Sequence, residues 1–80
     1  MNLKELEKEL LKMGVNSRLF SLNGNILPDR IIVDKCDSSE CWLVYYYDEK
    51  GKSNNVKKFY SENDVSEYVY NLFSEYMKNT

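Results

Sequence analysis

Residues 41–47 read CWLVYYY, an unbroken run of apolar and aromatic side chains near the middle of the chain. A strand with one buried and one wet face alternates apolar and polar residues, because successive side chains point to opposite faces. This run does not alternate. Either both faces of a central strand are covered, or one face presents aromatic rings to something outside the molecule. We adopt the second arrangement as the working hypothesis for function.

The length and composition of the chain indicate one small domain, which we assign to residues 1–80. A domain of this size buries only roughly 60–65% of its unfolded surface, so the seven Tyr, three Phe and one Trp supply important apolar area. No apolar stretch approaches the ~20 residues needed to cross a bilayer. Residues 1–11 carry charges throughout and lack the apolar core of a secretion signal. We therefore expect a cytoplasmic protein that contacts no membrane.

Two amphipathic helices are predicted, one near each end of the sequence. Over residues 2–13, apolar residues recur at spacings of three and four, and Asn2 and Glu5 occupy the positions of a capping box. The second helix begins after Ser61, where Glu62 and Asp64 favour the positive helix N-terminus. Its apolar stripe consists of Val65, Tyr68, Val69, Leu72, Phe73, Tyr76 and Met77.

Four strands are predicted between the helices, at residues 17–22, 30–36, 41–47 and 55–60, with turn signals at residues 23–25 and 48–51. This order predicts an α+β fold: helix, four-stranded antiparallel meander, helix, with the helices packed mainly on one sheet face. Parity along the third strand places one set of side chains inward and the other outward. The inward set is Trp42, Val44 and Tyr46, and the outward set is Leu43, Tyr45 and Tyr47.

The two cysteines, Cys36 and Cys41, are separated by residues 37–40. In a hairpin loop the two thiols could face each other, and a bridge would close a very short loop. Because a reducing cytosol keeps thiols free, two free thiols are the expected state. The chain has no His, and two Cys supply only half of a tetrahedral zinc site. We expect neither a metal nor any other cofactor.

Catalytic chemistry is not indicated by the sequence. Without His, the commonest general base is missing. A nucleophilic Cys needs a His partner or cationic surroundings to become a thiolate. The flanking carboxylates instead raise the thiol pKa, and they belong to Asp34, Asp37 and Glu40. We expect the protein not to be an enzyme.

Nucleic-acid binding is also disfavoured. The order helix, strands, helix is that of the double-stranded-RNA-binding domain, which grips 2′-hydroxyl and phosphate groups. Here the second helix starts with the acidic segment 61–64, which repels phosphate. The net charge of -2 also argues against nucleic-acid binding, because affinity for nucleic acid comes largely from Lys and Arg. Residues Lys50, Lys52, Lys57 and Lys58 are interpreted as a charged rim that protects solubility.

Protein binding fits the composition best, because interfaces are enriched in Tyr, Trp and Phe with charged groups at the rim. We predict Tyr45 and Tyr47 as binding hot spots. Replacing both with alanine is expected to weaken partner binding by at least ~2 kcal/mol without unfolding the domain. The carboxylates that would steer a basic partner are Asp34, Asp37, Glu40, Asp48 and Glu49. The alternative is that the two Tyr line a second small core.

Three segments together resemble known proteins: residues 20–24 (FSLNG), the strand at 42–46 running into residues 49–51 (EKG), and Phe59 followed by an acidic-capped aromatic helix. They resemble small bacterial immunity proteins encoded beside polymorphic or contact-dependent growth-inhibition toxins. The resemblance spans about residues 17–76. It implies a cytoplasmic antidote that binds a cognate toxin domain, often a nuclease, and blocks its active site or substrate surface. It transfers no contact residues.

The alternative function is a small homodimerising or adaptor module that uses the same sheet face or an edge strand. We expect a monomer or weak homodimer whose partner is a cognate toxin protein.

Overall fold

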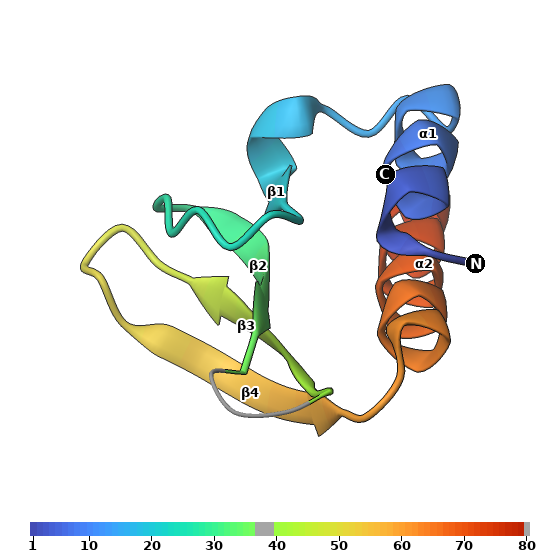
Figure 1. The fold of residues 1–80 in the computed structure, drawn as a ribbon. Helices are drawn as coiled ribbons and strands as arrows, with labels where there is room; N and C mark the ends of the chain where they lie inside the picture. The colour runs from blue at the N-terminus through green and yellow to red at the C-terminus, as the bar shows by residue number, and fades with distance from the viewer. Residues whose placement is uncertain (37–39, 80) are drawn as a thin grey trace.

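The structure is a computed structural model that describes residues 1–36 and 40–79. Within these residues the chain is α+β, with two α-helices and one four-stranded sheet (Figure 1). The elements in chain order are α1 (Leu3–Lys12), the 3₁₀-helix η1 (Ser17–Leu19), β1 (Phe20–Ser21), β2 (Arg30–Lys35), β3 (Trp42–Tyr47), β4 (Ser53–Phe59) and α2 (Glu62–Lys78).

Both predicted helices are confirmed, because their signals are local. In α1 the Asn2 side chain accepts a hydrogen bond from the Glu5 amide at 2.8 Å, and the Glu5 carboxylate accepts one from the Asn2 amide at 3.0 Å. This is the capping box expected from the sequence. At the start of α2, the Ser61 hydroxyl accepts from the Asp64 amide at 2.9 Å, which satisfies one of the free donors of the first turn.

The sheet is mixed, with the strand order β1-β2-β3-β4. β2 pairs antiparallel with β3, and β3 with β4, but β1 pairs parallel with β2 through Phe20↔Ile31 and Ser21↔Ile32. The predicted all-antiparallel meander is therefore wrong at its first strand. The turn signal at residues 23–25 does not make a hairpin, because the Asn23 side chain accepts from the Ser21 hydroxyl and the Asn25 amide. The chain then runs back along the sheet before β2 begins.

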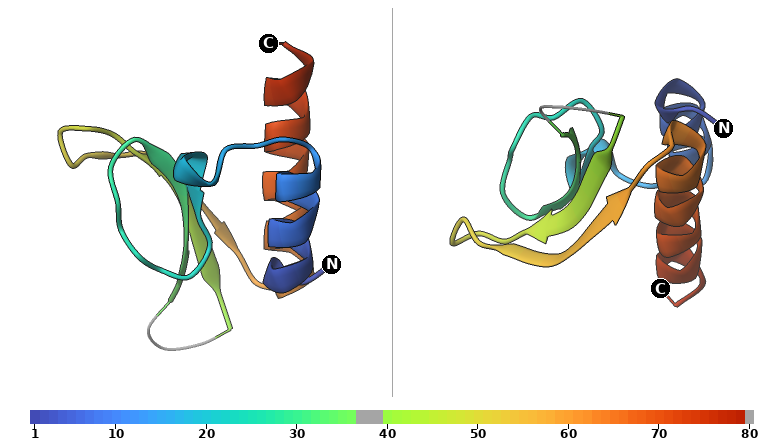
Figure 2. Two further views of the ribbon diagram at one scale, coloured as in Figure 1. Left: turned by 90° about the horizontal axis from the view of Figure 1, so that it is seen from above. Right: turned by 60° about the horizontal axis from the view of Figure 1, so that its bottom comes forward.

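α1 and α2 lie side by side on one face of the sheet (Figures 1 and 2). They run parallel, since the Leu3 amide donates to Glu62 Oε2 at 2.8 Å near their starts and Ser74 Oγ donates to Met13 Sδ at 3.8 Å further along. Glu62 thus places a carboxylate at the positive N-terminus of α1. Because α2 has 17 residues and α1 only 10, the last turns of α2 extend past the end of α1.

The main core lies between the helix pair and the sheet. Trp42 and Val44 face it, as parity predicted: Val44 is buried there, and Trp42 packs against it half-buried. The buried members of this core are Leu6, Leu10, Val15, Phe20, Val33, Val44, Val65, Val69 and Phe73.

A second, smaller cluster is buried on the opposite face of the sheet. Ile32, Cys41 and Tyr45 are buried there, at positions that alternate with the core-facing residues of β2 and β3. The segment 22–29 runs along this face, away from the helices (Figure 2). Both faces of β3 are therefore covered around Tyr45. The expectation that Tyr45 faces solvent is wrong, because its side chain is only 8% exposed beside its cross-strand neighbour Ile32 and the ring of Tyr47.

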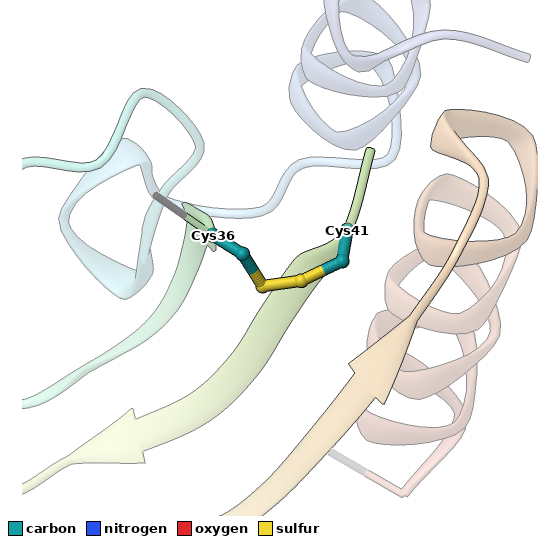
Figure 3. Close-up of a disulfide and its surroundings, with 2 residues drawn as sticks. All are labelled: Cys36 and Cys41. Atoms are coloured by element: carbon teal, nitrogen blue, oxygen red, sulfur yellow. A yellow bond between two sulfur atoms is a disulfide. The ribbon is translucent and has the colours of Figure 1, made fainter. Parts of the chain in front are cut away.

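The two cysteines form a disulfide, so the expectation of free thiols is wrong (Figure 3). Cys36 follows β2 and Cys41 precedes β3, and the Cys36 amide donates to the Cys41 carbonyl at 2.9 Å. This pairing sets the two Cα atoms 5.3 Å apart, within the usual range for a bridge. The register of the β2–β3 hairpin, rather than the redox compartment, determines that Cys36 and Cys41 lie close together.

Reducing this disulfide is expected to lower the free energy of unfolding by about 2 kcal/mol, because it closes a short loop and removes limited entropy from the unfolded chain. The check is urea unfolding of the oxidised protein and of a sample that has been reduced with a phosphine and then had its thiols blocked. A reduced protein that is unfolded without urea, or that is as stable as the oxidised one, would contradict this expectation.

Ser66 in α2 is fully buried, and its hydroxyl has no hydrogen-bond partner among residues 1–36 and 40–79. An unpaired buried hydroxyl costs roughly 1–3 kcal/mol. Ser66→Ala is therefore expected to raise the free energy of unfolding by about 1 kcal/mol. Ser61→Ala is the contrasting variant, because it removes the α2 cap and is expected to lower stability by a similar amount. Equal signs for the two variants in urea unfolding would contradict this assignment.

No helix in the described ranges 1–36 and 40–79 is long and apolar enough to cross a membrane.

Candidate functional site: a groove between the sheet and the end of α2

A groove of about 410 Å³ opens between the sheet and the C-terminal half of α2. Its apolar walls are Leu19, Ile31 and Tyr46 on one side and Leu72, Phe73 and Tyr76 on the other. Its polar rim consists of Asp29, Arg30, Glu75 and Asn79.

Two features of the fold produce this groove. First, α2 extends beyond the end of α1, and Tyr76 in its last turn stays 49% exposed, although Met77 beside it packs against the core. Second, a bulge interrupts the pairing of β3 with β4 between Val44 and Tyr46, where Asn55 has a positive φ of 55°. A bulge bends its strand and increases the local twist. Beyond it, the β3–β4 hairpin points away from the helices (Figure 1).

The apolar surface of the groove is exposed yet continuous with the core. Tyr46 is 38% exposed and Tyr76 49% exposed, and Leu72 is similarly accessible. Phe73 is buried beneath them and makes edge contacts with Phe20 at 6.0 Å and Tyr76 at 6.3 Å between ring centroids. The walls of the groove are therefore anchored on a rigid base.

Carboxylates gather around the Tyr46 end of the groove. The Tyr46 hydroxyl donates to Asp29 Oδ1 at 3.3 Å. Desolvation raises the pKa of Tyr46, and the negative charges of Asp29, Asp48 and Glu49 raise it further. Asp29 itself has a left-handed backbone with φ of 58°, a conformation that Asp tolerates better than most residues. Its amide donates to the Tyr47 carbonyl at 2.7 Å, which holds it at this position.

These charges are not neutralised by ion pairs. Across residues 1–36 and 40–79 the structure shows a single ion pair, between Lys12 and Glu9 in α1. Arg30, the cation on the groove rim, donates through Nε to the Pro28 carbonyl at 3.4 Å. The mouth of the groove therefore carries more negative than positive charge.

The predicted hot spots Tyr45 and Tyr47 lie on the opposite sheet face from the groove. Tyr45 is only 8% exposed, and Tyr47 is half-buried with its ring 6.4 Å from that of Tyr45. Burial first, then the charges of Asp34 and Tyr47, raise the pKa of Tyr45. These contacts match the alternative of a second small core. Tyr45 is not available as a surface contact.

The predicted steering charges do not form one surface. Asp34 is half-buried and pairs with Leu43 near the start of β3, and Glu40 is exposed just before that strand. Asp48 and Glu49 follow the far end of β3. Asp37 lies outside the described residues. Of this set, Asp48 and Glu49 are the two that lie close to Tyr46 and the groove.

Asp48 also organises the β3–β4 turn. Its Oδ1 accepts from the amides of Lys50 and Lys52 at 3.0 and 2.9 Å, and its Oδ2 accepts from Asn54 Nδ2 at 3.1 Å. These hydrogen bonds, that of the Lys52 amide first, lower the pKa of Asp48 below its ordinary value of 3.8. The side chain therefore has a structural role that the sequence did not reveal.

The lowered pKa of Asp48 predicts a pH dependence. Its stabilising contribution is fully present above the ordinary value of 3.8 and is lost as the pH falls below it, because the unfolded chain then binds the proton first. Asp48→Asn is expected to be less stable than the parent at pH 6, and the difference is expected to shrink as the pH falls below 3.8. Urea unfolding of both proteins across this range checks the convergence. A difference that stays constant with pH would contradict it.

The groove residues were missed because the sequence placed Tyr46, Leu72 and Tyr76 on buried faces. One signal was present: the second predicted helix is longer than the first, so part of its stripe lacks a partner. No local pattern marks Asp29.

Comparison of the chain with protein-family models, with curated proteins and with solved structures gave no match. Function is therefore inferred from the groove and its charges, together with the resemblance of the sequence segments.

Proposed function

We propose that this protein is an immunity protein that binds a cognate bacterial toxin domain, such as a nuclease, and neutralises it by direct contact. The observation that carries the proposal is the exposed aromatic groove, whose mouth carries carboxylates that form no ion pair within the described part of the chain. Exposed Tyr side chains over a rigid base have the character of binding hot spots. An acidic rim favours a basic partner and accelerates encounter. Toxin domains that grip RNA or DNA are basic at the surface an antidote would cover.

The proposed site of action is the cytoplasm, where the disulfide is expected to be reduced. A bridge that closes so short a loop adds only about 2 kcal/mol, so the folded state is expected to persist without it. The antidote would then act with either thiol state.

The test is growth rescue in bacteria. The C-terminal domain of the protein encoded immediately upstream is expressed from an inducible promoter, with and without this chain. Rescue of growth, together with a complex of the two purified proteins, is the expected result. Growth arrest that this chain does not relieve, although it is folded and abundant, would reject the proposal.

A homodimerising module is the second candidate, because β4 is an edge strand of the sheet with Val56 exposed. Lys57 and Lys58 on the same strand oppose edge-to-edge pairing. Sedimentation at micromolar concentration separates the candidates, since a stable dimer favours the second.

A further inference from the structure

We propose that the groove between Tyr46 and Tyr76 receives one large apolar side chain from a protein segment that carries Lys or Arg on both sides of it. This inference rests on the proposed function, because it specifies the chemistry of the partner surface. It also moves the expected contact surface to the groove from the outer sheet face, where Tyr45 is buried.

The apolar half of the argument comes from the walls. Tyr46, Leu72 and Tyr76 are the exposed apolar residues of the groove, and the buried Phe73 closes its base. A volume of about 410 Å³ lies near the small end of the range for pockets that enclose ligands, ~300–1,000 Å³. It suits one or two side chains rather than a whole helix. A large aromatic or aliphatic anchor would remove both Tyr rings from water.

The charged half of the argument comes from the rim. Asp29 lies at one end of the groove beside Tyr46, with Glu49 near the same phenol, and Glu75 lies on α2 along the opposite wall. None of the three has an ion-pair partner among residues 1–36 and 40–79. Among the described residues that line the groove, Arg30 is the one positive charge. Carboxylates on both sides of an apolar slot favour cations on both sides of the anchor.

A second copy of this chain is the competing occupant, because its β3–β4 hairpin carries Lys50, Lys52, Lys57 and Lys58. Such a contact would join two different surfaces of identical chains, so it extends into an open chain of molecules unless the two copies meet reciprocally or the rotation closes a ring. A separate basic partner avoids this outcome. Self-association is therefore kept as a result of the test.

The test uses a blocked Lys-Trp-Lys tripeptide as the probe and a blocked Glu-Trp-Glu tripeptide as its matched control. Each is titrated into the ¹⁵N-labelled full chain, and backbone amide shifts are followed by NMR. Saturable shifts confined to Ile31, Leu72, Tyr76 and their neighbours are expected with Lys-Trp-Lys. Binding of Glu-Trp-Glu is expected to be at least about fivefold weaker, from two exposed charge contacts of ordinary strength.

Two variants sharpen the test, each with a matched control. Tyr76→Ala is expected to abolish the saturable shifts, whereas Tyr60→Ala, at the other end of α2, leaves them unchanged. Glu75→Gln is expected to reduce the preference for Lys-Trp-Lys, whereas Glu7→Gln on α1 preserves it. Both residues of each pair are exposed, so loss of folding does not confuse the comparison. Amide spectra without peptide verify that each variant is folded.

Three results would overturn the inference. The first is the absence of saturable shifts with Lys-Trp-Lys up to about 10 mM, roughly tenfold above a weak dissociation constant of 1 mM. The second is equal binding of the two peptides, and the third is groove shifts that change on dilution without peptide, which indicate a second copy. The growth assay separates this inference from the proposed function. Rescue that survives Tyr76→Ala would refute the groove and leave the immunity role standing. Peptide binding without growth rescue would refute the immunity role and leave the groove inference standing.

Discussion

Tyr45→Ala is expected to lower the free energy of unfolding by about 3 kcal/mol, as for other large aromatic side chains removed from an interior. Tyr45 lies on a central strand, is almost fully buried with Ile32 and Cys41, and contacts the ring of Tyr47. A domain of this length has a total stability of only ~4–12 kcal/mol. The variant is therefore expected to unfold at much lower urea concentration than the parent.

The neighbouring residue supplies the control. Tyr46→Ala removes the same side chain one position along β3, on the other face, where the ring is partly exposed. Its cost is expected to stay below about 1 kcal/mol, as for most surface substitutions. Urea unfolding of both variants measures the difference. If Tyr45→Ala were as stable as Tyr46→Ala, the Tyr45 side chain would not be buried in solution as the structure shows.

Leu10→Ala is expected to cost ~2–5 kcal/mol, because it leaves a cavity between α1, α2 and the sheet. Leu10 is 0% exposed and belongs to the main core. Leu11 follows it in the same helix and is 49% exposed. Leu11→Ala makes the same chemical change at nearly the same place and is expected to alter stability by less than about 0.5 kcal/mol.

Thermal and urea unfolding of these two leucine variants test the face of α1 that the sequence predicted to be buried. A small effect at Leu10 with a large effect at Leu11 would mean that the helix is rotated about its axis. Equal effects would mean that the helix does not pack on the sheet as the structure describes.

The features predicted correctly depend on neighbours in sequence. The capping box at Asn2 and the cap at Ser61 determine where the helices start, and the strand at residues 41–47 was placed to within one residue. Parity then assigned Trp42 and Val44 to the helix side. Each of these rests on a periodicity or a cap that a few adjacent residues carry.

The features that failed depend on contacts between distant segments. The parallel pairing of β1 depends on the path of segment 22–29, whose residues carry no periodic pattern, and the burial of Tyr45 depends on its pairing with Ile32 of β2. The disulfide was judged from the redox compartment, although the register of the β2–β3 hairpin brings Cys36 and Cys41 together. The groove arises from a difference in helix length that no single helix reveals.

The parallel packing of α1 against α2 has a consequence for biosynthesis. α1 is translated before α2, yet its hydrophobic surroundings are completed by three residues of α2, Val65, Val69 and Phe73. A nascent chain without α2 would expose the apolar stripe of α1 and one whole sheet face to water. Pairing of sequence-distant elements also slows folding, because the intervening loop must be ordered before the contact forms. Native structure is therefore expected only after α2 has been synthesised.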